Sequence, residues 1–134
     1  MFIDASAMVA ILANEPGNAA LARAIKLAAE PITSALAVFE TATAVARKNG
    51  ISVEDARTAV YALLDLAGIT LIVLGDTEAR GALAAYARYG KGQGHPARLN
   101  MGDCFAYACA QAHEVALLFV GDDFPQTDIP SAMA

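Results

Sequence analysis

The sequence predicts an α/β domain with a mostly parallel central sheet. The main observation is an alternation along the chain: short apolar runs of strand character are followed by longer segments whose apolar residues recur at helical spacing. The second observation is size and composition. The chain has 134 residues, 57% of them hydrophobic, and we see no linker, repeat or low-complexity tract. One compact domain spanning residues 1–134 is therefore expected.

Strand and helix signals alternate through the first fifty residues. A strand over residues 1–4 (MFID) precedes a helix over 5–14, which ends at the turn-forming residues Asn-Glu-Pro-Gly-Asn. A second helix is predicted over residues 18–30 from its apolar face. A short strand over residues 31–34 (PITS) and a helix over 35–50 follow, and the Asn-Gly pair that ends this helix is a good stop signal.

The middle of the chain repeats this order. A helix over residues 52–68 begins at a serine that can cap it and ends at a glycine. The next segment, 69–74 (ITLIVL), is a continuous apolar run, which is typical of a strand buried on both faces. A capped helix is predicted over residues 76–90. A glycine-rich loop over residues 91–102 follows it.

The last third supplies one more helix and one more clear strand. The helix is predicted over residues 103–114 and the strand over 115–120 (VALLFV), and residues 127–132 are compatible with a final short strand. Cys104 and Cys109 lie five residues apart on the helix, which separates them by about 7.5 Å along its axis. This is too far for a disulfide, so two buried thiols in a reducing compartment are expected.

Composition excludes several classes of protein. Charged or polar residues interrupt every apolar run before the roughly 18–20 residues that a membrane-spanning helix needs. The N-terminus has an acid at position 4 and no basic segment, unlike a signal peptide, and a cytoplasmic protein is expected. The net charge of −5 argues against a general nucleic-acid binder. However, residues 79–102 contain no acid and carry four cations, namely Arg80, Arg88, Lys91 and Arg98.

Several acids fall at predicted element ends or on an apolar helix. They are Asp4, Glu40, Asp103 and Asp122, with Asp123 beside the last. Asp4 and Asp122 follow strands, and ligands bind beyond the carboxyl ends of parallel strands. Taken singly, each acid could be a helix cap, a turn residue or a solvent-exposed residue. No Lys or Arg lies near any of them in sequence, however, and carboxylates gathered without cations repel one another. Mg²⁺ or Mn²⁺ would relieve that repulsion and could activate a water against a phosphodiester.

Four segments resemble the VapC-type toxins of the PIN-domain ribonuclease family. They are MFIDASAMVAIL, FETATAVAR, YGKGQGHPARLNMGDCFAYACA and LLFVGDDFPQTDI, and together they span essentially the whole chain. The pairing of LNMGDCFAYA with GDDF and TDI is the most specific part of the resemblance. It implies a single PIN-like domain in which helices flank a central parallel sheet as a three-layer sandwich.

The resemblance also implies an activity and its residues. A Mg²⁺- or Mn²⁺-dependent endoribonuclease is expected, which cleaves structured RNA, transfer RNA foremost. The catalytic and metal-binding positions that match the family are Asp4, Glu40, Asp103 and Asp122. The neighbouring Asp123 is a further metal ligand and the alternative candidate for the fourth acid. Ser6 matches a polar position beside the first acid. We expect substrate contacts from Ser6 and from the four cations Arg80, Arg88, Lys91 and Arg98.

Partners follow from the same resemblance. A bacterial VapB-type antitoxin is expected to cover the groove and present an Arg to the acids, and the toxin is expected to form a homodimer within a larger toxin–antitoxin assembly. Contact with DNA would come only through the antitoxin.

Two other functions fit the residues. One is a catalytically silent PIN-fold binding protein whose acidic groove only receives the antitoxin Arg. In that case the apolar helices up to Gly50 would suit a groove for a partner helix, although they suit an ordinary core equally well. The other is a phosphohydrolase with an acidic pocket. Metal-dependent RNA cleavage separates the nuclease from the silent binding protein.

Overall fold

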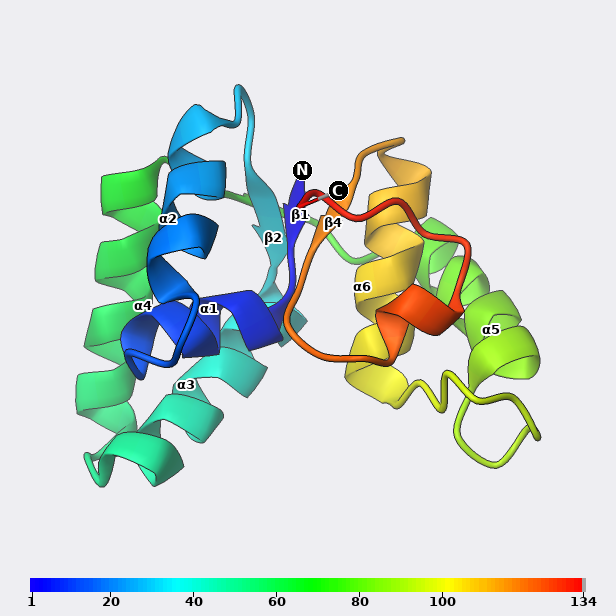
Figure 1. Cartoon of the computed structure of the whole chain (residues 1–134), viewed down its shortest axis with the longest axis horizontal. Helices are drawn as coiled ribbons and strands as arrows, with labels where there is room; N and C mark the ends of the chain where they lie inside the picture. Colours follow the sequence, from blue (N-terminus) through cyan, green and yellow to red (C-terminus); the bar gives the residue numbers. More distant parts are fainter. Residues whose placement is uncertain (134) are drawn as a thin grey trace.

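A computed structural model describes residues 1–133 and has a four-stranded parallel sheet at its centre (Figure 1). Along the sheet the strand order is β3-β2-β1-β4. The strands are short: β1 (Phe2–Ile3), β2 (Ile32–Ser34), β3 (Thr70–Ile72) and β4 (Leu117–Leu118). Phe2 of the central strand β1 pairs with Ile32 on one side and with Leu117 on the other. The predicted α/β class is therefore confirmed.

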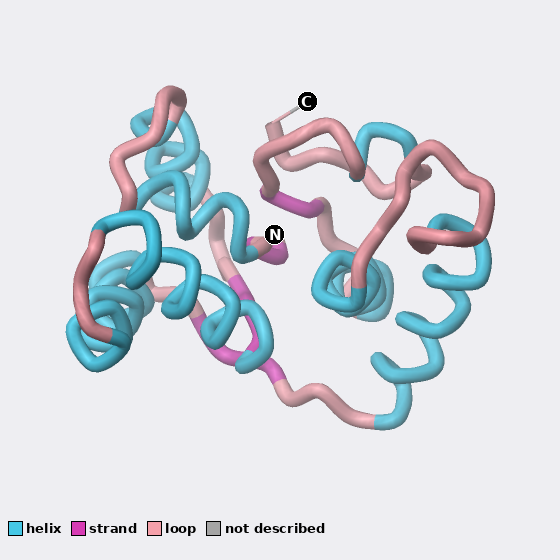
Figure 2. The backbone as a smooth tube through the Cα atoms, turned by 90° about the horizontal axis from the view of Figure 1, so that it is seen from below, coloured by secondary structure: helices cyan, strands magenta, loops and turns pink. Residues whose placement is uncertain are grey.

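Helices cover both faces of this sheet. They are α1 (Ala5–Leu12), α2 (Asn18–Leu27), α3 (Ala35–Asn49), α4 (Val53–Ala67), α5 (Asp76–Tyr89) and α6 (Met101–Ala112), followed by the short 3₁₀ helix η1 (Phe124–Gln126). Figures 1 and 2 both show α1 to α4 on one side of the sheet and α5 and α6 on the other. Each side has its own buried hydrophobic cluster. The three-layer arrangement predicted from the family resemblance is confirmed.

Local signals in the sequence set the helix ends. The Ser34 hydroxyl accepts a hydrogen bond from the Ala37 N–H at 3.1 Å, and the Ser52 hydroxyl accepts one from the Asp55 N–H at 3.0 Å. Capping by serine satisfies backbone donors that the first turn of a helix leaves free. Helix α3 ends where Gly50 adopts a φ of 63°, a left-handed conformation that glycine adopts without strain. These caps fix both ends of α3 and the start of α4.

Two predicted strands differ from the structure. The 69–74 segment is not buried on both faces, because β3 lies at the edge of the sheet: Leu71 is 40% exposed and Val73 is 83% exposed. Residues 127–132 do not form a strand but run beside β4, where Ser131 makes a single bridge to Leu117. The two cysteines are free and buried, as predicted. None of the helices within residues 1–133 has the length and hydropathy needed to cross a membrane.

Candidate active site

The first acid, Asp4, lies between a strand and a helix. It directly follows β1 and caps the N-terminus of α1, and its side chain is only 5% exposed. One carboxylate oxygen, Oδ2, accepts hydrogen bonds from the Ser6 N–H at 3.0 Å and from the Ser6 hydroxyl at 2.5 Å. Burial raises the pKa of Asp4, while the bonds from Ser6 act in the opposite direction. The side chain is therefore fixed in orientation but costly to keep charged.

Ser6 connects Asp4 to the segment that follows β4. While its hydroxyl donates to Asp4, its oxygen accepts a hydrogen bond from the Val120 N–H at 3.0 Å. Strands β1 and β4 are neighbours, so their carboxyl ends meet at one edge of the sheet. Ser6 therefore links the first acid to the chain that leads to Asp122 and Asp123.

The second acid, Glu40, comes from helix α3 and meets the start of helix α6. Its carboxylate packs directly on Gly102: a methyl group added at that glycine would overlap with Glu40 Oε2 and would lie 2.7 Å from Oε1. Burial raises the pKa of Glu40 to about 7, with further contributions from the charges of Asp4 and Asp103. Because Gly102 has no side chain, the Glu40 carboxylate can occupy the space beside it.

The third acid, Asp103, belongs to the first turn of α6. Asn100 and Asp103 form a reciprocal capping box: the Asp103 N–H donates to Asn100 Oδ1 at 2.9 Å, and the Asn100 N–H donates to Asp103 Oδ2 at 3.1 Å. Burial raises the pKa of Asp103 to about 6. The bond from Asn100 opposes this shift, and the charges of Asp4 and Asp123 reinforce it. Asp103 therefore does help to cap α6, and the capping hydrogen bonds also orient its carboxylate.

These three acids line one cavity of about 470 Å³, which we call the acid pocket. Ser6 and Val120 also line it. Three further lining residues were not predicted from the sequence as functional, namely Glu15, Arg47 and Lys48. Arg47 follows Glu40 by seven residues, which is two helical turns and hence the same helix face. A search beyond the nearest turn of α3 could have found it.

Asp122 and Asp123 are placed differently from the three pocket acids. Both are exposed in the bend between β4 and η1, and neither is among the lining residues of the acid pocket. The charge of Asp123 nevertheless contributes to the raised pKa of Asp103. Of the two candidates for a fourth acid, Asp123 is thus the one whose charge acts on the pocket. Metal ligation by either residue stays a prediction.

The four predicted RNA-binding cations lie outside the acid pocket. Arg80 on α5 pairs with Asp76 at 2.7 Å, and Arg88 pairs with Asp128 at 3.4 Å. Lys91 and Arg98 are exposed in the loop between α5 and α6. None of the four is among the lining residues of the acid pocket, and their contact with RNA stays a prediction.

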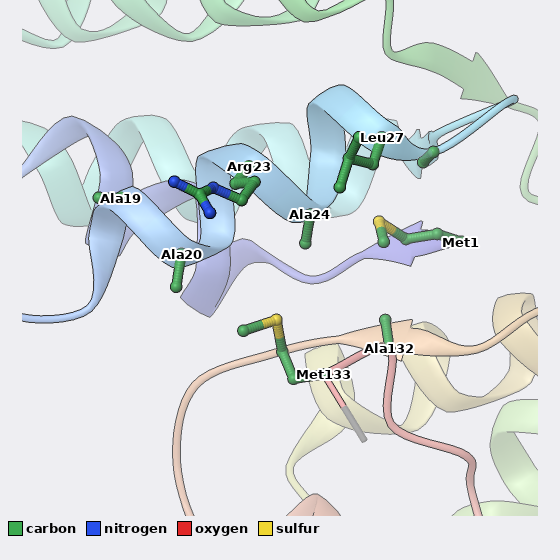
Figure 3. Close-up of a pocket in the computed structure, with 9 residues that line it drawn as sticks. Met1, Ala19, Ala20, Arg23, Ala24, Leu27, Ala132 and Met133 are labelled. Carbon is green, nitrogen blue, oxygen red and sulfur yellow. The ribbon is translucent and has the colours of Figure 1, made fainter.

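A larger cavity lies elsewhere and has a different chemistry. About 630 Å³ in volume, it is formed by helix α2 together with both ends of the described chain, where the side chains of Met1, Leu27 and Met133 gather (Figure 3). Among its described lining residues the one charged side chain is Arg23. This cavity holds no group suited to hydrolysis, so the acid pocket is the candidate active site.

The donor set of the acid pocket suits a hard divalent cation. The charged oxygen donors that the pocket offers are carboxylates, which Mg²⁺ and Mn²⁺ prefer. Within residues 1–133, no three His, Cys, Asp or Glu side chains converge closely enough to hold a metal ion by themselves. Mg²⁺, however, usually keeps several waters and takes only one or two carboxylates directly. The pocket therefore fits an ion that is held partly through water.

Comparison with known proteins decides the family. A PIN-domain family model matches residues 1–130. The chain belongs to the PIN-domain family. Within it, the chain is 40% identical to ribonuclease VapC42 of Mycobacterium tuberculosis over 132 residues, which is 98% of each protein. It is 37% identical to a VapC ribonuclease of Rhizobium meliloti over 139 residues, covering 96% of this chain and 98% of that one. The VapC-type resemblance is therefore confirmed over nearly the whole chain.

A solved structure supports the fold independently. The crystal structure of Mycobacterium tuberculosis VapC20, described as a toxin that cleaves the sarcin–ricin loop, superimposes with a TM-score of 0.74. The match covers 96% of this PIN-domain chain and 95% of that chain, at 19% sequence identity. Since identity is this low, the likeness concerns the fold.

Proposed function

We propose that this PIN-domain protein is a VapC-type endoribonuclease that needs Mg²⁺ or Mn²⁺ to hydrolyse phosphodiester bonds of structured RNA. One observation carries the proposal. Carboxylates from three separate elements, β1–α1, α3 and α6, face one cavity, and none of them forms an ion pair within residues 1–133. Burial of unpaired carboxylates costs stability, so their retention is best understood as a functional requirement.

Each acid has a distinct supporting contact in this chemistry. Ser6 holds the Asp4 carboxylate in one orientation, and the capping box holds that of Asp103. Glu40 occupies the space beside Gly102 and can take up a proton near neutral pH, because its pKa is about 7. A bound divalent cation would activate a water and stabilise the charge that develops on the phosphate. The pocket residues supply oriented carboxylates, which would hold the cation. No histidine is required as a base, because the cation would activate the water.

The substrate and partner are proposed from the family relationship. The names of the relatives as ribonucleases support RNA as the substrate class. We propose structured RNA with transfer RNA foremost, and the sarcin–ricin loop named for VapC20 is the rival target. A VapB-type antitoxin whose Arg pairs with the pocket acids would neutralise the same carboxylates, and a homodimeric toxin in the bacterial cytoplasm completes this proposal. The alternative, a catalytically silent binding protein, can be tested because such a protein would cleave no RNA.

The test is cleavage of RNA by the purified protein with and without metal. A transfer RNA mixture and a sarcin–ricin stem-loop are incubated with the protein in millimolar Mg²⁺ or Mn²⁺, or in EDTA. We expect cleavage of transfer RNA with metal and none in EDTA. In Asp4→Asn the rate should fall by about a hundredfold or more, because one charged oxygen donor is lost. Asparagine can still cap α1, so the circular dichroism spectrum should not change.

Asp65→Asn is the matched control, because Asp65 is an exposed aspartate on α4 outside the acid pocket. Its cleavage rate should equal that of the wild type. Cleavage that persists in EDTA, or an Asp4→Asn variant as fast as the wild type, would remove the metal mechanism. Absence of any cleavage while an antitoxin still binds would support the silent binding protein instead.

A further inference from the structure

One wall of the acid pocket is a single face of helix α3. Four residues of this helix line the cavity: Glu40 and, three, four and seven positions after it, Thr43, Ala44 and Arg47. Residues at these spacings lie above one another on a helix, and Arg47 stands about 10.5 Å along the axis from Glu40. Glu40 and Arg47 thus lie at opposite ends of this wall.

Two cations line that end of the pocket, but they are not equivalent. The Lys48 ammonium pairs with Glu15 Oε1 at 3.2 Å, and the neighbouring Asn49 side chain donates to the Leu12 carbonyl at 3.3 Å. Both contacts tie the end of α3 to the turn after α1, so Lys48 has a structural partner. Arg47 is exposed and forms none of the ion pairs found within residues 1–133.

Arg47 does not neutralise the acids either. It lies about 10.5 Å along the helix axis from Glu40 and forms no ion pair with any of the three pocket acids. Arg47 therefore lines the same cavity as the carboxylates, and its hydrogen-bond donors are left for another group. A guanidinium presents a planar fork of donors that matches phosphate oxygens in two-point contacts.

We propose that Arg47 is a substrate-binding residue that contacts a backbone phosphate of the RNA beside the phosphate held at the acids. This inference rests on the proposed function. An RNA strand entering the pocket brings further negative charge toward three carboxylates, and Arg47 supplies attraction along that path without cancelling the charge of the acids. It adds a contact on the α3 side of the molecule, whereas the cations predicted from the sequence lie on and after α5.

Binding in a cleavage-impaired background tests this contact directly. Affinity of Asp4→Asn for a fluorescein-labelled transfer RNA mixture is measured by anisotropy over a range of salt concentrations. Adding Arg47→Ala should weaken binding about tenfold. It should also reduce the salt slope by about 0.7, because one phosphate contact of an unpaired strand is lost. Arg57→Ala is the matched control, because Arg57 is an exposed arginine on α4 that lies outside the acid pocket, and it should change neither quantity.

The activity of Arg47→Ala with all acids intact separates this inference from the proposed function. We expect KM to rise about tenfold with kcat changed less than threefold, and Arg47→Lys should recover part of the salt slope. Affinity and slope identical to those of the parent would overturn the contact; a lowered melting temperature alone would then assign Arg47 to stabilising the end of α3. If the wild type cleaves no RNA but Arg47 still governs RNA binding, the proposed reaction fails while the contact stands.

Discussion

Carboxylates in two regions of this molecule differ in their partners and in the direction of their pKa shifts. On the α5 side, Asp76 pairs with Arg80, and the exposed Asp128 accepts hydrogen bonds from the Tyr107 hydroxyl at 2.5 Å and from Arg88 at 3.4 Å. The bond from Tyr107 is the main reason that the pKa of Asp128 is lowered. In the acid pocket, Glu40 and Asp103 are half-buried without cation partners, and their pKa values are raised.

This difference is the reverse of what stability alone would favour. Exposed ion pairs contribute little, typically 0–1 kcal/mol, whereas a buried carboxylate without a partner is costly. The arginines that form ion pairs do so at exposed sites, where the pairs contribute little to stability. The half-buried carboxylates of the acid pocket have no cation partner. A site built to receive a cation from solution accounts for that pattern.

The largest expected effect comes from filling the space that Glu40 uses. In Gly102→Ala the new methyl group would meet the Glu40 carboxylate, which is the mobile end of a flexible side chain and can move away. We expect RNA cleavage to fall by up to about a hundredfold, because displacement of a catalytic group by about 1 Å has this effect. The melting temperature should change little. Gly75→Ala is the matched control, because a methyl group at Gly75 would make only ordinary van der Waals contact, and this variant should keep full activity. Gly92→Ala is unsuitable, because Gly92 has a φ of 89°, which strains any residue with a side chain.

If Gly102→Ala cleaves RNA at the wild-type rate, the position of the Glu40 carboxylate against α6 does not matter for the reaction. A large loss of melting temperature would instead indicate that the backbone of α6 had moved, and the loss of cleavage would then not be due to Glu40 alone.

A smaller effect concerns the pH dependence of stability in EDTA. The pKa values of Glu40 and Asp103 are raised from ordinary values of 4.5 and 3.8 to about 7 and about 6. Between these limits the folded state binds more protons than the unfolded state, so stability falls as pH rises. We expect the melting temperature in EDTA to fall from about pH 4.5 to about pH 7.5. Asp128, whose pKa is lowered, acts in the opposite sense and only below its ordinary value of 3.8.

Glu40→Gln should flatten the upper part of this fall, since one titrating group is removed from the pocket. Glu54→Gln, at the exposed start of α4, should leave the profile unchanged. Stability that stays level or rises over the same pH range in EDTA would contradict the raised pKa values of the buried pocket acids.

The sequence predicted the parts of the fold that depend on local chemistry. Serine caps, terminal glycines and apolar periodicity placed all six helices within a few residues, and Asp4 at the end of a strand pointed to the correct edge of the sheet. The edge position of β3 was missed because an apolar run does not report its place in the strand order. That order depends on how distant segments pair.

The candidate site was predictable for the same reason and to the same extent. Asp4 is itself the cap of α1, Asp103 lies in the first turn of α6, and Glu40 is conspicuous on an apolar helix. The participation of Glu15 and Lys48 in the wall of the acid pocket was not predictable, because it depends on the packing of α1 against α3. Local spacing also could not distinguish Asp122 from Asp123, since adjacent residues in a bend differ only in direction.

Direct metal binding tests the central claim, which is that the unpaired carboxylates form a cation site. Mn²⁺ is titrated into the metal-free protein, and free Mn²⁺ is followed by electron paramagnetic resonance. We expect saturable binding of one or two ions by the wild type and by Asp128→Asn, whose carboxylate lies outside the acid pocket. Asp4→Asn should lose most of this binding. No binding at millimolar Mn²⁺, or equal binding by wild type and Asp4→Asn, would contradict the account.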